Sequence, residues 1–326
     1  MTATSTAFQR WLSSHLRKSI LAAAALLASA AFVSAQETVT LDDLADSAQA
    51  WAKENLDEDL LRALEGKDQR RVKEFIDQLQ KELHGEYVID LARLKDAATS
   101  IVPLLESYEE TQPYAAWLKP RLDYLEIAEE LRILIPPPKP KPGEIPKPVV
   151  VPPAKAREVW IKKVTARPWP PNARPYVDQL KPIFAAEKVP PELVWVAEVE
   201  SSFDPRARSP AGAVGMFQLM PATAKSCGLS TWPFDQRLKP EPSARAAAQY
   251  LKKLYSRYHD WRLALAAYNA GPGTVDGLLA RQKTRSFDAI ATRLPAETQL
   301  YVPKLEATLR QREVVSLTAL QTPREG

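Results

Sequence analysis

The sequence predicts a mainly α-helical protein built of two globular parts on either side of a proline-rich stretch. Its length of 326 residues suits about two domains, and apolar residues recur at helical spacing in both parts. The charge also changes sign: residues 36–135 hold 12 Lys and Arg against 23 Asp and Glu, and residues 136–326 hold 29 against 17. A hydrophobic content of 45% excludes wholesale disorder, and the single Cys227 excludes an internal disulfide or a cysteine-rich zinc site.

Residues 1–35 are typical of an export signal. They hold three basic residues and no acidic one, and the apolar run from Ile20 to Ala35 is too short to span a bilayer comfortably. Because small residues precede Gln36, we expect cleavage after Ala35 and a periplasmic or secreted protein. An uncleaved membrane anchor is the alternative that stays open.

Residues 36–135 form a predicted separate, acidic α-helical domain. One series of apolar residues at spacings of three and four ends near Gly85, a natural helix stop. Its members are Val72, Phe75, Ile76, Leu79 and Leu83, and similar series run from Leu91 to Ile101 and from Tyr124 to Leu131. No motif in this segment carries chemistry. Two hypotheses follow from its charge: it docks on the basic part, or it recruits an envelope protein as a partner.

Residues 136–153 form a predicted linker, because nine of these 18 residues are proline. Proline lacks the backbone donor that a helix or an inner strand needs. In a polyproline II conformation, at about 3.1 Å per residue, the stretch would reach roughly 55 Å and hold two domains apart. A ligand for a proline-recognition module is the alternative.

Residues 154–326 carry the candidate chemistry. Pro190 and Pro191 suit the start of a helix, and the run that follows is apolar nearly all round, so it predicts a buried helix. Glu200 falls in line with the apolar side of this run. Desolvation and the negative end of the helix dipole should both raise its pKa, which suits a general acid at neutral pH. A hydrogen-bonded or solvated glutamate is the plain alternative for this residue alone.

Three motifs surround and follow that glutamate. The first consists of residues 200–205 and 209–221, beginning Glu200-Ser201-Ser202-Phe203 and ending Gln218-Leu219-Met220-Pro221. The second is residues 266–273, with Tyr268-Asn269-Ala270-Gly271 at its centre, and the third is residues 294–302, from Leu294-Pro295-Ala296-Glu297-Thr298 to Tyr301-Val302. In this order they resemble the soluble lytic transglycosylase (SLT) domain family, closest to its membrane-bound lytic murein transglycosylase D branch. The resemblance covers about residues 172–312.

The resemblance implies a lysozyme-like, mainly helical SLT catalytic domain at residues 154–326. It implies cleavage of the β-1,4 bond between N-acetylmuramic acid and N-acetylglucosamine in peptidoglycan, ending in 1,6-anhydromuramic acid. Glu200 would act first as the acid and then as the base. Two other functions remain open: a muramidase that uses Glu200 and Glu297 to activate water, and a non-catalytic protein that binds the cell wall as a scaffold.

The family's supporting residues fall on positions that also have plainer interpretations. Ser209, Gln218 and Met220 match residues near the scissile bond, although a turn explains the serine and core packing the methionine. Tyr268 and Asn269 end a helix that starts near Asp260 and stops at Gly271, and Tyr268 matches the family tyrosine beside the glutamate. Glu297 matches a glycan-binding acid, and pairing with an arginine is its alternative. The sequence indicates no metal, no cofactor and no nucleic-acid partner.

Overall fold

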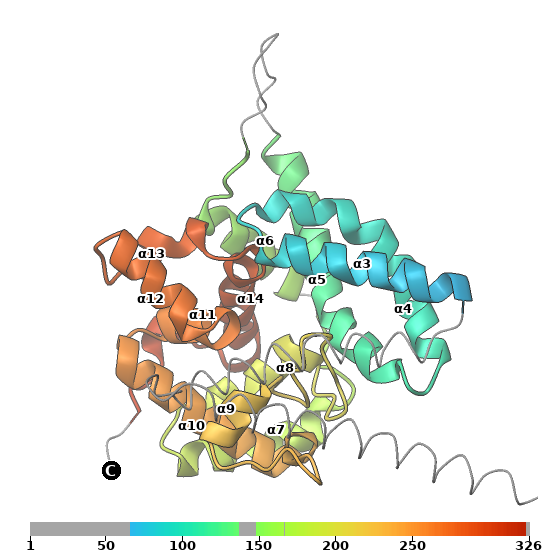
Figure 1. Cartoon of the computed structure of the whole chain (residues 1–326). Coiled ribbons are helices and arrows are strands. Elements are labelled where there is room, and N and C mark those ends of the chain that lie inside the picture. The colour runs from blue at the N-terminus through green and yellow to red at the C-terminus, as the bar shows by residue number, and fades with distance from the viewer. Residues whose placement is uncertain (1–65, 137–147, 166, 324–326) are drawn as a thin grey trace, which may run out of the picture. The chain divides into compact units, whose positions relative to one another are not determined.

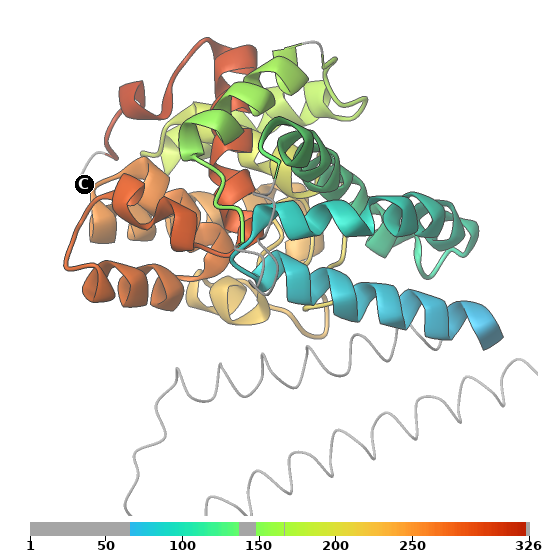
Figure 2. The same ribbon diagram turned by 90° about the horizontal axis from the view of Figure 1, so that it is seen from above.

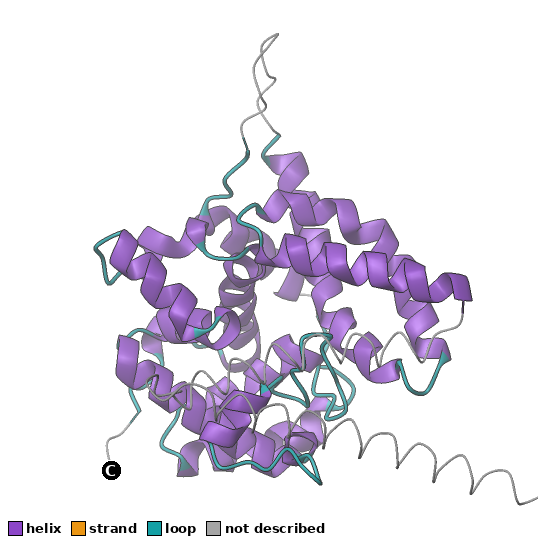
Figure 3. Cartoon of the chain, viewed as in Figure 1, coloured by secondary structure: helices purple, strands orange, loops and turns teal. Residues whose placement is uncertain are grey.

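The computed structural model describes residues 66–136, 148–165 and 167–323, and these residues are helical or in loops, with no strand among them (Figure 3). The predicted mainly α class is confirmed. None of the described helices has the length and apolar character needed to cross a membrane. The predicted export signal and most of the proline-rich linker lie outside the described residues.

The first described part contains three α-helices and one 3-10 helix. They are α3 (Gly66–His84), η1 (Val88–Leu94), α4 (Lys95–Ser107) and α5 (Gln112–Leu134). Their ribbons, blue to green, lie together in Figures 1 and 2. The apolar series predicted from the sequence point into one core, where Leu79, Leu91 and Leu125 are fully buried. The helix stop at Gly85 is also confirmed, because α3 ends one residue earlier.

The second part starts with α6 (Pro153–Thr165) and α7 (Ala173–Ala186), followed by the short pair η2 (Pro191–Trp195) and α8 (Val196–Ser201). After a long loop come α9 (Pro221–Ser226), η3 (Gln236–Leu238), α10 (Pro240–Tyr258) and α11 (Trp261–Ala270). The chain continues with α12 (Pro272–Arg281), α13 (Phe287–Ile290), η4 (Ala291–Arg293), α14 (Ala296–Glu313) and η5 (Leu317–Ala319). The predicted limits of α11 are confirmed, with the Asp260 side chain accepting from two backbone N–H groups at its start.

Helix α14 is buried nearly all round because it contributes to two hydrophobic cores. Tyr301 and Leu305 face the core formed by α7, α8, α10 and α11. Ala296, Leu300 and Ala307 belong instead to the core of α3–α6. A helix that is buried on most sides needs partners on most sides, and α14 finds them in both parts of the chain.

The structure does not hold the two parts of the chain at a distance from each other. All the described residues fall in one compact unit, and the two cores meet at α14. Backbone hydrogen bonds also join them, from Ala296 N to Gly85 O at 2.7 Å and from Arg208 N to Pro113 O at 2.9 Å. The expectation of a spacer that separates two domains is therefore wrong in this respect. Because α14 covers apolar side chains of the α3–α6 core, the acidic segment docks on the basic one.

Candidate active site

The short helix that carries Glu200 is fixed from both ends. Pro190 precedes η2, which runs directly into α8. Ser202 then takes a left-handed conformation with φ of 54° and ends the helix. Every residue of α8 is buried, and Glu200 is only 4% exposed. The prediction of a buried helix with the glutamate in line with its apolar side is thus confirmed.

The Glu200 carboxyl faces an arginine from the acidic part of the chain. Arg121 of α5 places its Nη2 3.5 Å from Glu200 Oε2. The same guanidinium donates from Nη1 to the Glu200 backbone carbonyl at 3.2 Å and from Nε to Glu297 Oε1 at 3.0 Å. One buried cation therefore touches both carboxylates and the Glu200 backbone carbonyl.

Burial raises the pKa of Glu200 to about 7. The charge of Arg121 opposes this shift, and the negative charge of Glu297 adds to it. Desolvation disfavours an ionised carboxylate, so a group this deep keeps its proton up to neutral pH. The predicted direction is confirmed, and the dominant cause is desolvation. A carboxyl group with such a pKa can donate a proton and take one back at neutral pH.

Two tyrosines lie next to the Glu200 carboxyl. The Tyr268 hydroxyl donates to the Phe217 carbonyl at 2.7 Å, and burial first, then the charge of Glu200, raises its pKa well above the ordinary value. Burial followed by Glu200 raises the pKa of Tyr301 in the same way. The Tyr301 hydroxyl is buried beside Glu200 but makes no hydrogen bond of good geometry to any described residue. Both phenols stay neutral and can only donate or accept hydrogen bonds there.

The loop after α8 is built around its own polar groups. Ser209 Oγ accepts from Ala213 N at 2.8 Å, and the Gln218 side chain donates to the carbonyls of Ala207 and Gly215 at 3.2 and 2.8 Å. Gly215 has φ of 83°, and a Cβ there would lie 2.1 Å from the Arg237 carbonyl oxygen, so only glycine fits. The contacts of Ser209 are those of a turn. Gln218 Oε1 is buried without a partner among the described residues.

The other residues predicted from the motifs lie at the edges of this arrangement. Met220 is half-buried and precedes α9. Asn269 Oδ1, at the end of α11, accepts from Thr298 Oγ1 at 2.6 Å, which joins the second motif to the third. Glu297 pairs with Arg121, so the expected alternative of an arginine partner is what the structure shows. The structure thus brings Glu200, Tyr268 and Glu297 together and leaves Ser209 engaged in its own turn.

Sequence reasoning missed Arg121, the residue that joins the two glutamates. A signal was present, because Arg121 lies four residues after Trp117 and three before Tyr124, on the apolar side of α5. A charged residue within an apolar stripe predicts a buried partner. Asp123 and Lys304 are two further charged residues within buried stripes. They pair between α5 and α14, with Nζ and Oδ2 3.0 Å apart.

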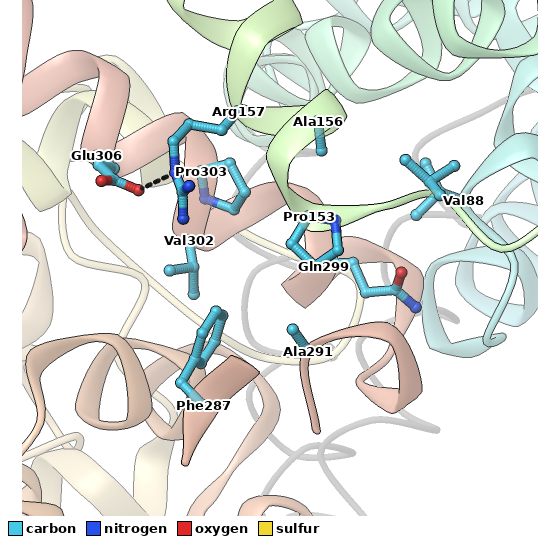
Figure 4. Close-up of a pocket in the computed structure, with 11 residues that line it drawn as sticks. Val88, Pro153, Ala156, Arg157, Phe287, Ala291, Gln299, Val302, Pro303 and Glu306 are labelled. Atoms are coloured by element: carbon cyan, nitrogen blue, oxygen red, sulfur yellow. Dashed lines mark hydrogen bonds and ion pairs between the residues drawn. The ribbon is translucent and has the colours of Figure 1, made fainter. Parts of the chain in front are cut away.

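A separate pocket lies among η1, α6, α13 and α14 (Figure 4). Arg157 and Glu306 form an ion pair at its edge, with Nε and Oε2 2.9 Å apart. Val151 and Pro153, from the end of the proline-rich stretch, also line it. None of the site residues predicted from the sequence lines this pocket.

Comparison with known families places the site within a recognised domain. Residues 183–291 match the model of the transglycosylase SLT domain. That range contains Glu200, Tyr268 and the loop between them, but neither Arg121 nor Glu297. The chain is 38% identical over 140 residues to membrane-bound lytic murein transglycosylase D of Escherichia coli K12, over 42% of this chain and 31% of that protein.

Other proteins are also similar to this chain. The soluble lytic murein transglycosylase of E. coli K12 is 33% identical over 142 residues, or 40% of this chain and 22% of that protein. A putative tributyltin chloride resistance protein of Alteromonas sp. strain M-1 is 31% identical over 145 residues, or 43% of this chain and 68% of that protein. The solved 70 kDa soluble lytic transglycosylase of E. coli aligns with a TM-score of 0.40 at 21% identity, over 85% of this chain and 46% of that one.

These findings define an SLT-domain protein, and the chain belongs to the transglycosylase SLT domain family. It is homologous to membrane-bound lytic murein transglycosylase D and to other lytic transglycosylases. The chain spans under a third of the length of the two E. coli lytic murein transglycosylases that it matches in sequence.

Proposed function

We propose that this protein is a peptidoglycan lytic transglycosylase. It cleaves the β-1,4 bond between N-acetylmuramic acid and N-acetylglucosamine and leaves a 1,6-anhydromuramoyl end. The observation that carries the proposal is the buried carboxyl of Glu200, whose pKa of about 7 lets it act as both acid and base, in a segment homologous to lytic murein transglycosylases.

In the first step the protonated Glu200 donates its proton to the glycosidic oxygen as the bond to the anomeric carbon breaks. The 2-acetamido group of the muramoyl residue stabilises the positive charge left on that carbon. In the second step the muramoyl 6-hydroxyl attacks the same carbon and gives its proton back to Glu200. No water is consumed, because the nucleophile comes from the substrate itself, where it is already held near the reacting carbon.

The remaining residues from the three motifs are proposed to bind the glycan. They are Ser209, Gln218, Met220, Tyr268, Asn269 and Glu297. The Gln218 Oε1 atom, which has no partner among the described residues, supports such a role, because a buried acceptor without a donor costs free energy until a ligand satisfies it. Tyr268 lies next to Glu200 and can orient the carboxyl or a sugar hydroxyl.

A muramidase is the second candidate, because the Glu297 carboxylate contacts the same Arg121 guanidinium as Glu200 and so lies near it. It would use Glu297 to take a proton from water, and the product would be a reducing muramic acid one water heavier. The ion pair with Arg121 counts against this role, since it already engages the Glu297 carboxylate that would have to contact the water. A scaffold that only binds the wall would give no products at all.

The deciding experiment is mass spectrometry of the glycans released from purified sacculi. The wild-type protein should give anhydromuramoyl ends, and Glu200→Gln should lower the rate about a hundred- to ten-thousand-fold while binding to sacculi is kept. Glu192→Gln, a partly exposed glutamate at the start of η2, is the matched control and should act like the wild type. Reducing ends from the wild type would replace the proposal with the muramidase.

The proposed substrate lies in the cell envelope, and the predicted export signal at residues 1–35 would deliver the protein there. An envelope protein partner for residues 36–135 stays a proposal. Secretion of the chain with and without residues 1–35, followed by N-terminal sequencing of the mature protein, tests the signal and the expected cleavage after Ala35.

A further inference from the structure

We infer that Arg121, from the helical segment before the SLT domain, is a positioning residue of the active centre that holds Glu200 and Glu297 in one arrangement. This inference rests on the proposed function, since it assigns Arg121 to the reaction that Glu200 would catalyse. It also means that the active centre is built from both parts of the chain, and that the SLT segment supplies only some of it.

The first argument is the geometry of one side chain that makes three contacts at the site. Arg121 touches the Glu200 carboxyl at 3.5 Å, the Glu200 carbonyl at 3.2 Å and the Glu297 carboxyl at 3.0 Å. The carbonyl belongs to the last turn of α8, where backbone acceptors lack partners within the helix. The planar fork of a guanidinium offers several donors at fixed angles, which the single point charge of a lysine cannot imitate.

The second argument is that the guanidinium is itself fixed. Its carbon lies 4.6 Å from the centre of the Trp117 ring, and Nη1 also donates to the Trp117 carbonyl at 3.1 Å. Two residues further along α5, Asp123 pairs with the buried Lys304 of α14. The Trp117 contacts hold the Arg121 guanidinium against its own helix, and the Asp123–Lys304 pair ties that helix to α14.

The third argument is electrostatic. Charged or titratable groups on three helices influence Glu200: Arg121 and Tyr124 from α5, Tyr268 from α11, and Glu297, Tyr301 and Lys304 from α14. Among these charges, Arg121 has the largest effect on the pKa of Glu200 and lowers it against burial and Glu297. Loss of the Arg121 charge should therefore raise the pKa of Glu200 further and make it a weaker acid at neutral pH.

Two alternative roles for Arg121 make different predictions. If Arg121 only neutralises two buried acids, a lysine in its place keeps the charge and the wild-type turnover. If Arg121 blocks the site by pairing with Glu200, its replacement makes the enzyme faster. A positioning residue gives a slower enzyme whose pH profile has moved.

The test compares Arg121→Met and Arg121→Lys with Arg132→Met, an exposed arginine of the same helix paired with Glu129. The rate at which anhydromuropeptides are released from sacculi is measured between about pH 5 and pH 9. For Arg121→Met we expect the alkaline limb of the pH–rate profile to move to higher pH by about one to three units. Turnover at neutral pH should fall about tenfold to a hundredfold. Arg121→Lys keeps the charge, so its limb should stay in place while turnover falls about tenfold. Arg132→Met should match the wild type.

A second readout does not depend on activity. Carboxyl ¹³C NMR of the full-length protein, with Glu200→Gln to assign the signal, should show the Glu200 titration moving to higher pH in Arg121→Met. An unchanged limb and turnover in Arg121→Met, or a faster enzyme, would overturn the inference. If Arg121→Met does not fold, Arg121→Lys decides, because wild-type turnover in that variant would exclude a role for the fork. If the wild type released no anhydro products, the proposed function would be wrong. The NMR titration would still test whether Arg121 lowers the pKa of Glu200.

Discussion

Helix α8 carries two buried glutamates, and its two sides show how differently a protein can treat the same residue. Glu198 and Glu200 are each 4% exposed and each meets an arginine. Arg312 donates two hydrogen bonds to Glu198, from Nε to Oε2 at 3.0 Å and from Nη2 to Oε1 at 2.9 Å. Arg121 touches the Glu200 carboxyl only once, at 3.5 Å, because it is shared with Glu297.

The difference teaches that burial alone does not prepare a carboxyl group for catalysis. A bidentate arginine compensates the lost hydration of a carboxylate and fixes it as a structural anion. An arginine shared between two carboxylates compensates the lost hydration only in part, so the buried Glu200 carboxyl keeps its proton up to neutral pH. On this view Glu198 holds α8 against α14, and Glu200 is left free to exchange a proton.

The largest expected effect on stability is at the structural glutamate. Glu198→Gln should lower the free energy of unfolding by about 3–5 kcal/mol, because it leaves the buried charge of Arg312 without an opposite charge and with one hydrogen bond fewer. Urea denaturation followed by circular dichroism measures the loss. Glu192→Gln provides the control and should stay within about 0.5 kcal/mol of the wild type. A Glu198→Gln variant as stable as the wild type would erase the contrast between the two sides of α8.

The next largest effect is a pH dependence of stability at the catalytic glutamate. The pKa of Glu200 is about 7 in the folded protein against an ordinary value of 4.5. Below the lower value both states keep the proton, and between the two values only the folded state keeps it. The free energy of unfolding should therefore fall by about 3 kcal/mol as the pH rises through this window.

Glu200→Gln cannot ionise and should lose this part of the slope. The measurement is the difference in unfolding free energy between wild type and variant at about pH 5 and pH 8, since other groups contribute alike to both proteins. The free energy of unfolding of the variant should increase relative to that of the wild type as the pH rises. A constant difference would mean that Glu200 titrates at an ordinary pKa, and its burial would then not prepare it for acid catalysis.

Much of this contrast was predictable from the sequence. The apolar run before Glu200 predicted its burial and the direction of its pKa shift, because desolvation depends mainly on what surrounds a residue along its own helix. Glu198 lies two residues earlier, and this spacing alone puts it on another face of the helix. The limits of α11 followed from Asp260 and Gly271, whose capping roles are local.

The partners of the two glutamates were not predictable, because they come from distant parts of the chain. Arg121 lies 79 residues before Glu200 and Arg312 lies 114 residues after Glu198. Helical periodicity places a residue on a face of its own helix and does not say which helix will cover that face. For the same reason the proline-rich stretch predicted separation, although the apolar surface of α14 draws α3–α6 onto it.

The smallest effects are expected for Ser209→Ala. As with the two glutamates, the question is whether a buried polar group serves structure or chemistry. The Ser209 oxygen accepts from Ala213 N, yet its hydroxyl proton can still be donated to a sugar acetamido group. Ser209→Ala should lower stability by about 1 kcal/mol through the lost turn contact, whereas a role in binding should also raise KM about fivefold. Thermal unfolding and sacculus digestion measure the two effects separately, with Ser226→Ala, an exposed serine at the end of α9, as the control. A loss of stability with an unchanged KM would assign Ser209 to the turn, because a hydroxyl that binds substrate cannot be removed without weakening that binding.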